Sequence, residues 1–148
     1  MHKPLYFFLV DDDSDDVTLF GELLQEIDST IKFQSAANGL DALGKLRSCD
    51  KVLPDLIFLD LNMPLMDGKE CLEEIKKDDN LNGIPVIIFT TSSHSRDIEH
   101  MLQSGAIGFI TKPTSMIKLK DILTSIKTNF PNNLDDKSSH IYRRGKVD

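Results

Sequence analysis

The chain has 148 residues, of which 40% are hydrophobic and 28% charged, and its formal net charge is −7. This length and composition predict one globular domain with an ordinary core and leave no room for a second domain. The negative charge argues against nucleic acid or an anionic membrane as the main partner, because both need clustered Lys and Arg. We therefore expect soluble protein or small-molecule partners.

Two cysteines, Cys49 and Cys71, occur without CxxC spacing and without a nearby group of histidines. The sequence therefore predicts neither a disulfide framework nor a zinc site, and a reducing compartment is the simplest setting. The longest apolar run near the N-terminus covers residues 5–10, which is too short for a signal-peptide core or a membrane span. We expect a cytoplasmic protein that has no contact with a membrane.

Short apolar runs alternate along the chain with segments of helical periodicity. The runs predict strands at residues 5–10, 31–36, 55–61, 85–91 and 107–111. Apolar side chains at spacings of three and four predict helices at residues 17–27, 40–46, 67–77, 96–104 and 115–128. Strands this apolar, when joined by helices, are typical of a parallel sheet covered on both faces. The predicted fold class is therefore α/β, a three-layer sandwich.

Polar side chains follow the predicted strands, at the point where each strand ends. They include Asp11, Asp12, Asp13, Asp60, Asn62, Thr90 and Lys112. Because ligands bind beyond the carboxyl ends of parallel strands, we expect these residues to lie at one edge of the sheet. Carboxylates that lie close together repel one another unless a cation joins them, and Mg²⁺ prefers a few such oxygens with a carbonyl and waters. Asp12, Asp60 and the backbone around Asn62 match that set.

The acidic stretch at residues 11–16 divides into two predicted parts. Ser14, Asp15 and Asp16 are predicted to form the N-cap and first turn of the first helix, where carboxylates offset the helix dipole by ~0.3–1 kcal/mol each. Asp13 fits either the rim of an acidic pocket or a loop. Only the residues nearest the strand end are therefore expected to bind a metal.

An aspartate beside Mg²⁺ can attack a phosphoryl group and form an acyl phosphate, and Asp60 is placed for this role. Phosphoryl transfer needs little covalent help, but it requires neutralisation of the charge on the phosphoryl oxygens. In this hypothesis Mg²⁺, the Lys112 ammonium and the Thr90 hydroxyl supply that neutralisation together. The sequence therefore indicates phosphate chemistry centred on Asp60.

Four segments carry a resemblance to a known family: LVDDD at 9–13, DLIFLDLNMPLMDG at 55–68, PVIIFTT at 85–91 and GAIGFITKP at 105–113. In this order and spacing they resemble the receiver domain of two-component response regulators, over roughly residues 4–129. The resemblance implies a flavodoxin-like, doubly wound fold: a five-stranded parallel sheet in the order 2-1-3-4-5 with five helices. It also implies a receiver domain at residues 1–130 and a polar tail at 131–148, which we expect to be disordered or to pack in a homodimer.

The resemblance assigns a role to each residue at the strand ends. Asp60 would be the phosphoacceptor, which receives its phosphoryl group from a sensor histidine kinase or a histidine phosphotransfer protein. Lys112 would pair with the phosphoryl oxygens, and Thr90 and Phe109 would be the switch residues. The metal, Mg²⁺ with Mn²⁺ as a possible substitute, would be held by Asp11, Asp12, Asp60 and the backbone carbonyl of Asn62. Such a protein is not a conventional enzyme, because it catalyses only its own phosphorylation and dephosphorylation.

The segment after residue 129 leaves no room for a DNA-binding or catalytic output domain. Output is therefore expected to pass to a downstream protein target through contacts of the receiver itself, whose surface phosphorylation would switch. The single-domain format and the DDDSDD and FTTSS segments look similar to stand-alone receivers of the chemotaxis and phytochrome-associated types.

Three alternatives stand beside this interpretation. Counted from Asp11, an EF-hand calcium loop would find acids at positions 1, 3 and 5 and Glu22 at position 12, but Asp16 stands where the loop requires Gly. A phosphatase of the haloacid dehalogenase type needs a second Asp two residues after its nucleophile, and here that residue is Asn62. A degenerate receiver that serves only as a docking module would lack the acceptor, the acid pair or the lysine, and all of these are present.

Overall fold

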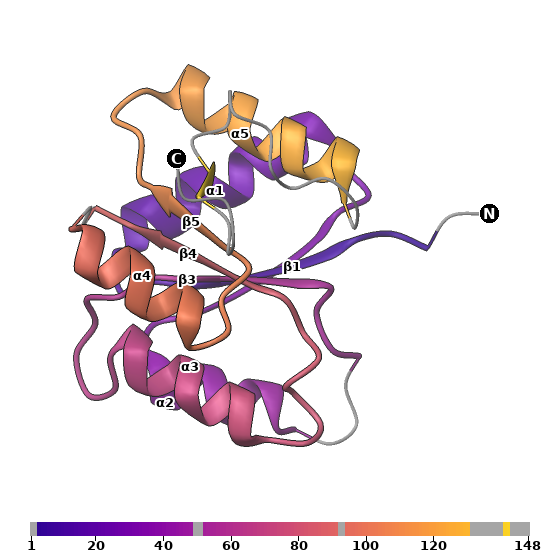
Figure 1. Cartoon of the computed structure of the whole chain (residues 1–148). Helices are drawn as coiled ribbons and strands as arrows, with labels where there is room; N and C mark the ends of the chain where they lie inside the picture. Colours follow the sequence, from indigo (N-terminus) through magenta and orange to yellow (C-terminus); the bar gives the residue numbers. More distant parts are fainter. Residues whose placement is uncertain (1–2, 49–51, 92–93, 131–140, 143–148) are drawn as a thin grey trace.

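The computed structural model describes residues 3–48, 52–91, 94–130 and 141–142 of the chain (Figure 1). Its parallel strands are β1 (Tyr6–Val10), β2 (Lys32–Ala36), β3 (Leu56–Leu59), β4 (Val86–Thr90) and β5 (Gly108–Thr111). Its helices are α1 (Ser14–Ile27), α2 (Gly39–Leu46), α3 (Gly68–Lys77), α4 (Ser95–Gln103) and α5 (Met116–Asn129). All ten predicted elements are present, and strands alternate with helices along the chain as the sequence predicts.

The sheet has the strand order β2-β1-β3-β4-β5, and each of these pairs is parallel. This confirms the doubly wound, flavodoxin-like arrangement implied by the resemblance. A short sixth strand, β6 (Ile141–Tyr142), pairs antiparallel with β5 and was not predicted. The rest of the segment 131–148, for which disorder or a dimer contact was predicted, lies outside the described residues, as does Cys49.

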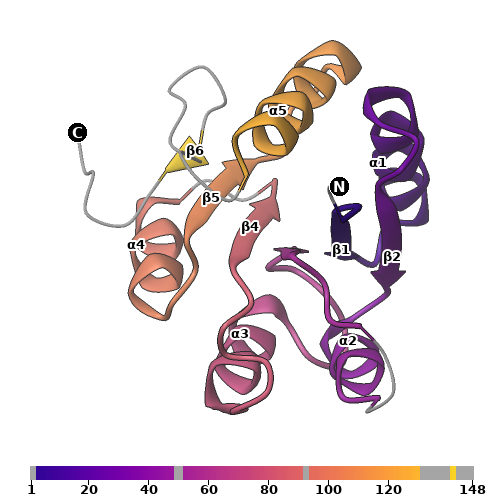
Figure 2. The ribbon, with the colours of Figure 1, turned by 90° about the vertical axis from the view of Figure 1, so that its right-hand side faces the viewer.

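The helices cover both faces of the sheet, which gives the predicted three layers. Figure 2 shows α1 and α5 on one face and α2, α3 and α4 on the other. Successive strand residues point to opposite faces: Phe58 of β3 joins the core beneath α1 and α5, while Ile57 joins the core on the other face. Phe20 of α1 packs edge to face on Phe58 and Phe89, with ring centroids 4.9 and 5.6 Å apart.

No helix among the described residues has both the length and the apolar character that crossing a bilayer requires.

The four central strands β1, β3, β4 and β5 run in the same direction, so their carboxyl ends meet at one edge of the sheet. The sequence places its Asp, Thr and Lys candidates at that edge.

Cys71 lies on α3 with its side chain fully buried. Burial raises the pKa of its thiol from 9.0 to about 12, although the nearby charge of Arg47 opposes this rise. Because the thiolate is the reactive form, a rise of this size lowers the reactive fraction at neutral pH by ~1000-fold.

We therefore expect Cys71 to resist alkylation by iodoacetamide in the native protein and to react readily in denaturant. Digestion followed by mass spectrometry of the peptide that contains Cys71 measures the extent of labelling. The denatured sample is the control for peptide recovery. Rapid labelling of Cys71 in the native protein would contradict this packing of α3.

Candidate functional site

The loop between β1 and α1 places two aspartates at the edge of the sheet. Asp11 follows β1 directly, and its backbone N–H donates to the Ala36 carbonyl over 3.0 Å, which ties this loop to the end of β2. Its side chain is buried, and its Oδ1 atom accepts a hydrogen bond from the Asp13 N–H over 2.9 Å. Asp12 is exposed. One carboxylate is therefore fixed inside the site and the next faces solvent.

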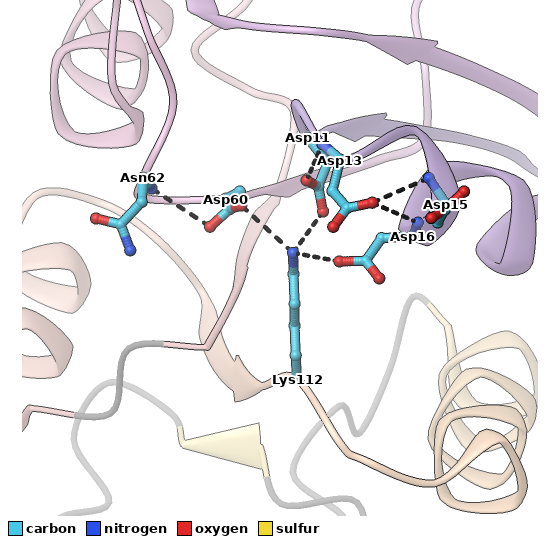
Figure 3. Close-up of polar contacts among 7 residues, drawn as sticks. All are labelled: Asp11, Asp13, Asp15, Asp16, Asp60, Asn62 and Lys112. Atoms are coloured by element: carbon cyan, nitrogen blue, oxygen red, sulfur yellow. Dashed lines mark hydrogen bonds and ion pairs between the residues drawn. The ribbon is translucent and has the colours of Figure 1, made fainter.

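Asp60 stands one position after β3, the strand that pairs with β1. Its backbone N–H donates to the Val10 carbonyl over 3.0 Å, which brings it level with Asp11. Its residue is 5% exposed, and its Oδ1 atom accepts a hydrogen bond from the Asn62 N–H over 3.3 Å (Figure 3). The Asp60 carboxylate is thus oriented by the loop that follows it.

Gly68 holds the same loop close to the start of α3. Its N–H donates to the Leu61 carbonyl over 3.0 Å, and a Cβ at this position would overlap the Asp60 carbonyl oxygen and lie 2.8 Å from Leu61 Cα. Asp67 caps α3 by accepting a hydrogen bond from the Glu70 N–H over 3.0 Å. The backbone of Gly68 therefore packs directly against the backbone of Asp60 and Leu61.

Gly68→Ala is expected to lower the free energy of unfolding by ~1–3 kcal/mol, because the added methyl group must displace the Asp60 backbone. Urea denaturation measures this change. Gly44→Ala is the matched control: Gly44 lies in α2, and apart from its two chain neighbours and the backbone of its own helix, no atom of the described residues comes within 4 Å of the place its methyl group would take. Ala should therefore be neutral there or stabilising by up to ~1 kcal/mol. Equal stability of the two variants would contradict the close approach at Gly68.

Lys112, just after β5, reaches across the edge of the sheet into this group of carboxylates (Figure 3). Its ammonium lies 2.7 Å from Asp11 Oδ2, 2.9 Å from Asp16 Oδ2 and 3.4 Å from Asp60 Oδ2. The side chain is 11% exposed, and the ammonium lies 5.6 Å from the centre of the Phe89 ring. Burial disfavours the charged form, but the pairs with Asp11 and Asp16 and the charge of Asp60 outweigh it and raise the pKa of Lys112.

The carboxylates of Asp11, Asp12 and Asp60 form a group suited to a metal ion, with one oxygen of each within 4.8 Å of the others. Burial, together with the charge of Asp60, raises the pKa of Asp11 above its ordinary value, while the pair with Lys112 and the hydrogen bond from the Asp13 N–H oppose that rise. The buried Oδ2 atom of Asp11 forms an ion pair with Lys112 without hydrogen-bond geometry, so it retains capacity to bind a cation. Three carboxylates so placed fit a hard divalent cation, and we call Asp11, Asp12 and Asp60 the metal group.

The start of α1 differs from the prediction in one residue. Asp13, rather than Ser14, is the N-cap, and its Oδ1 atom accepts hydrogen bonds from the N–H groups of Asp15 and Asp16 over 2.9 and 3.1 Å. Asp and Ser cap helices equally well, so composition could not choose between them. The Asp13 carboxylate therefore caps α1, and it is not one of the three carboxylates in the metal group.

Asp16 is a site residue that sequence reasoning missed. It was predicted only as part of the first turn of α1, whereas its carboxylate pairs with Lys112, a residue 96 positions away. The sequence contains no local signal for this contact, because it depends on how the first turn of α1 faces the end of β5.

Thr90 and Phe109 are both buried, in the neighbouring strands β4 and β5. Thr90 ends β4, and its carbonyl accepts a hydrogen bond from the Lys112 N–H over 2.7 Å, which links the end of β4 to the lysine. Phe109 is fully buried in β5 and belongs to the core beneath α2, α3 and α4. The structure thus places both predicted switch residues on the strands that lead to the site, while their switching role stays a prediction.

Glu22, which the EF-hand alternative needs as a ligand, lies in the middle of α1 and not with Asp11, Asp12 and Asp60. The residues after Ser14 form a helix rather than a calcium-binding loop, so the EF-hand alternative is wrong. The edge of the sheet instead carries the group of three carboxylates suited to a metal ion, Asp11, Asp12 and Asp60, with Lys112 beside them.

Comparison with known proteins identifies the family to which this geometry belongs. Residues 7–124 match the response regulator receiver domain. The chain is 32% identical over 126 residues to the chemotaxis protein CheY-3 of Vibrio cholerae, covering 85% of this chain and 94% of that protein.

Solved structures agree with this match. The phosphorylated cyanobacterial phytochrome response regulator RcpA is 34% identical, with a TM-score of 0.79 over 84% of this chain and 92% of that one. The Mn²⁺-bound response regulator Rcp1 is 31% identical, with a TM-score of 0.74 over 84% and 93% of the two chains. The chain belongs to the response regulator receiver domain family of two-component signalling and is similar to CheY.

Proposed function

We propose that the protein accepts a phosphoryl group on Asp60 from a phosphohistidine of a sensor histidine kinase or a histidine phosphotransfer protein. One observation carries this proposal: the buried Asp60 carboxylate lies in one group with Asp11 and Asp12, and the Lys112 ammonium lies 3.4 Å away. A buried carboxylate flanked by a metal group and a lysine is what an aspartyl phosphate requires. An intact site of this kind does not favour a degenerate docking module.

Asp11, Asp12 and Asp60 would hold Mg²⁺, together with the backbone carbonyl of Asn62 as the remaining ligand from the protein. Mn²⁺ would serve in its place, since Rcp1 has been solved with Mn²⁺ bound. When bound, the cation neutralises charge on the phosphoryl oxygens during transfer. The donor set of carboxylate and carbonyl oxygens fits these hard cations and not a softer metal.

Asp60, Lys112, Thr90 and Phe109 would have different roles in phosphoryl transfer and in the response to it. An Asp60 carboxylate oxygen attacks phosphorus, the new O–P bond forms as the N–P bond to the donor histidine breaks, and the imidazole leaves with that electron pair. Lys112 pairs with a phosphoryl oxygen, and the Thr90 hydroxyl moves toward another. The buried Phe109 ring responds to that movement and alters the protein-binding surface.

The protein would act as a single-domain response regulator, which passes its signal on through the protein-binding surface that phosphorylation alters. Residues 1–130 would be the receiver and residues 131–148 a tail, with a homodimer as one possible assembly. The acidic chain and the likeness to CheY-3 and RcpA favour a cytoplasmic protein that contacts a downstream protein rather than DNA or a membrane.

The metal requirement tests this function directly. Incubation with acetyl phosphate and Mg²⁺ is expected to add one phosphoryl group to the protein, and removal of Mg²⁺ with EDTA is expected to lower the rate by at least ~100-fold. Intact mass spectrometry follows the product, and alkaline hydroxylamine, which cleaves acyl phosphates, should remove it. Phosphorylation that proceeds equally in EDTA would refute the proposed mechanism.

A further inference from the structure

Lys112 is held by three carboxylates that are not equivalent. Asp11 and Asp60 belong also to the metal group, whereas Asp16 pairs with the lysine and is not a member of that group. Figure 3 shows Asp16 approaching the ammonium from the first turn of α1, from a different direction than Asp60. Among the described residues, Asp16 is therefore the ion-pair partner of Lys112 that remains available when a divalent cation engages the others.

Two cations must share this site during phosphoryl transfer. A divalent cation bound by Asp11, Asp12 and Asp60 takes up the negative charge that otherwise attracts Lys112, and it repels the ammonium directly. Lysine has a long flexible side chain, so an ammonium without a fixed partner swings toward solvent. Something outside the metal group has to keep it beside Asp60.

We propose that Asp16 is a positioning residue that holds the Lys112 ammonium beside Asp60 when the metal is bound. This inference rests on the proposed function, because it concerns the lysine that would meet the phosphoryl oxygens. The contact supports it: Asp16 Oδ2 accepts a hydrogen bond from Lys112 Nζ over 2.9 Å, shorter than the 3.4 Å to Asp60. A charged hydrogen bond of this length fixes the ammonium more firmly than the longer contact does.

The backbone of α1 places Asp16 for this role before any ligand arrives. Its N–H donates to Asp13 Oδ1 over 3.1 Å, so the cap of the helix holds the residue in position. Its side chain is 39% exposed, which lets the carboxylate keep part of its hydration while it pairs with Lys112. Asp16 thus anchors the lysine without the desolvation that a buried carboxylate suffers.

The first test follows the Lys112 ammonium itself, by ¹H–¹⁵N NMR of the lysine side chains during a Mg²⁺ titration. Lys112→Met identifies the resonance by its loss. In the wild type the signal should persist at saturating Mg²⁺, whereas in Asp16→Ala it should broaden or disappear as Mg²⁺ is added, and Asp16→Glu should retain it. Asp15→Asn is the matched control, because it removes a charge from the same helix turn outside the pairs of Lys112.

The second test measures the rate of phosphorylation by acetyl phosphate at saturating Mg²⁺. Asp16→Ala should be ~10-fold slower than the wild type, with Asp15→Asn within ~2-fold of it and Asp16→Glu restoring most of the rate. If the wild type is not phosphorylated, the proposed function fails, and the NMR titration still decides the role of Asp16. A Lys112 signal that responds to Mg²⁺ identically in the wild type and in Asp16→Ala would overturn the inference, as would an equal loss in Asp15→Asn.

Discussion

Asp60→Asn is expected to abolish phosphorylation by acetyl phosphate in the presence of Mg²⁺, with a rate at least ~100-fold below the wild type. The amide nitrogen that replaces one carboxylate oxygen cannot attack phosphorus, and the amide is a poor metal ligand. Intact mass spectrometry measures the product, and the wild type should reach one phosphoryl group per chain. This variant should also fold well, because the charge of Asp60 raises the pKa of Asp11 and its removal relieves that repulsion.

Asp13→Asn is the matched control for this experiment. It also converts one aspartate at the same edge of the sheet to asparagine, but Asn caps a helix as well as Asp does, so α1 should be preserved. Its rate of phosphorylation should stay close to that of the wild type. If the Asp60→Asn variant were phosphorylated stoichiometrically at another residue, Asp60 would not be the phosphoacceptor.

Lys112→Met is expected to lower the free energy of unfolding by about 2–4 kcal/mol in the absence of divalent cations. The substitution keeps an apolar stem near Phe89 but leaves the buried carboxylate of Asp11 beside Asp60 without a cation. Because Mg²⁺ binds the folded protein, adding it should recover much of this loss, and Mg²⁺ should bind the variant more tightly than the wild type. Urea denaturation with and without Mg²⁺ measures both effects.

Lys120→Met provides the comparison for Lys112→Met. Lys120 on α5 pairs with Glu26 on α1 over 3.0 Å, but both side chains are largely exposed, so its loss should change stability by less than ~1 kcal/mol with no dependence on Mg²⁺. Lys112→Met should still accept a phosphoryl group, more slowly, but should not pass the change to a partner-binding surface. If both variants lost the same stability and Mg²⁺ did not change that loss, Lys112 could not be the cation that neutralises Asp11 and Asp60.

The fold followed from patterns that are local in the sequence. Each central strand is a short apolar run that fits only a sheet buried on both faces, and the helices between them carry apolar stripes. The positions of Asp60 and Lys112 followed as well, because each comes directly after such a run and the carboxyl ends of parallel strands meet.

The helix cap at Asp13 and the strand β6 (Ile141–Tyr142) did not follow from the sequence. Ser14 and Asp13 have nearly equal preference for the N-cap, so the choice between them is made by which backbone N–H groups each can reach. Two residues carry too little periodicity to predict a strand, and β6 forms only because β5 offers an edge for pairing.

The sequence by itself determined the order of strands and helices, the buried core and the acidic and basic residues at the strand ends, because these depend on hydrophobic period and on chain direction. Only the tertiary structure decided how those charges pair. The approach of α1 to the end of β5 sets Asp16 2.9 Å from Lys112, across 96 positions of sequence. Ion pairs depend on distances of a few ångströms between separate elements, and no local pattern encodes them.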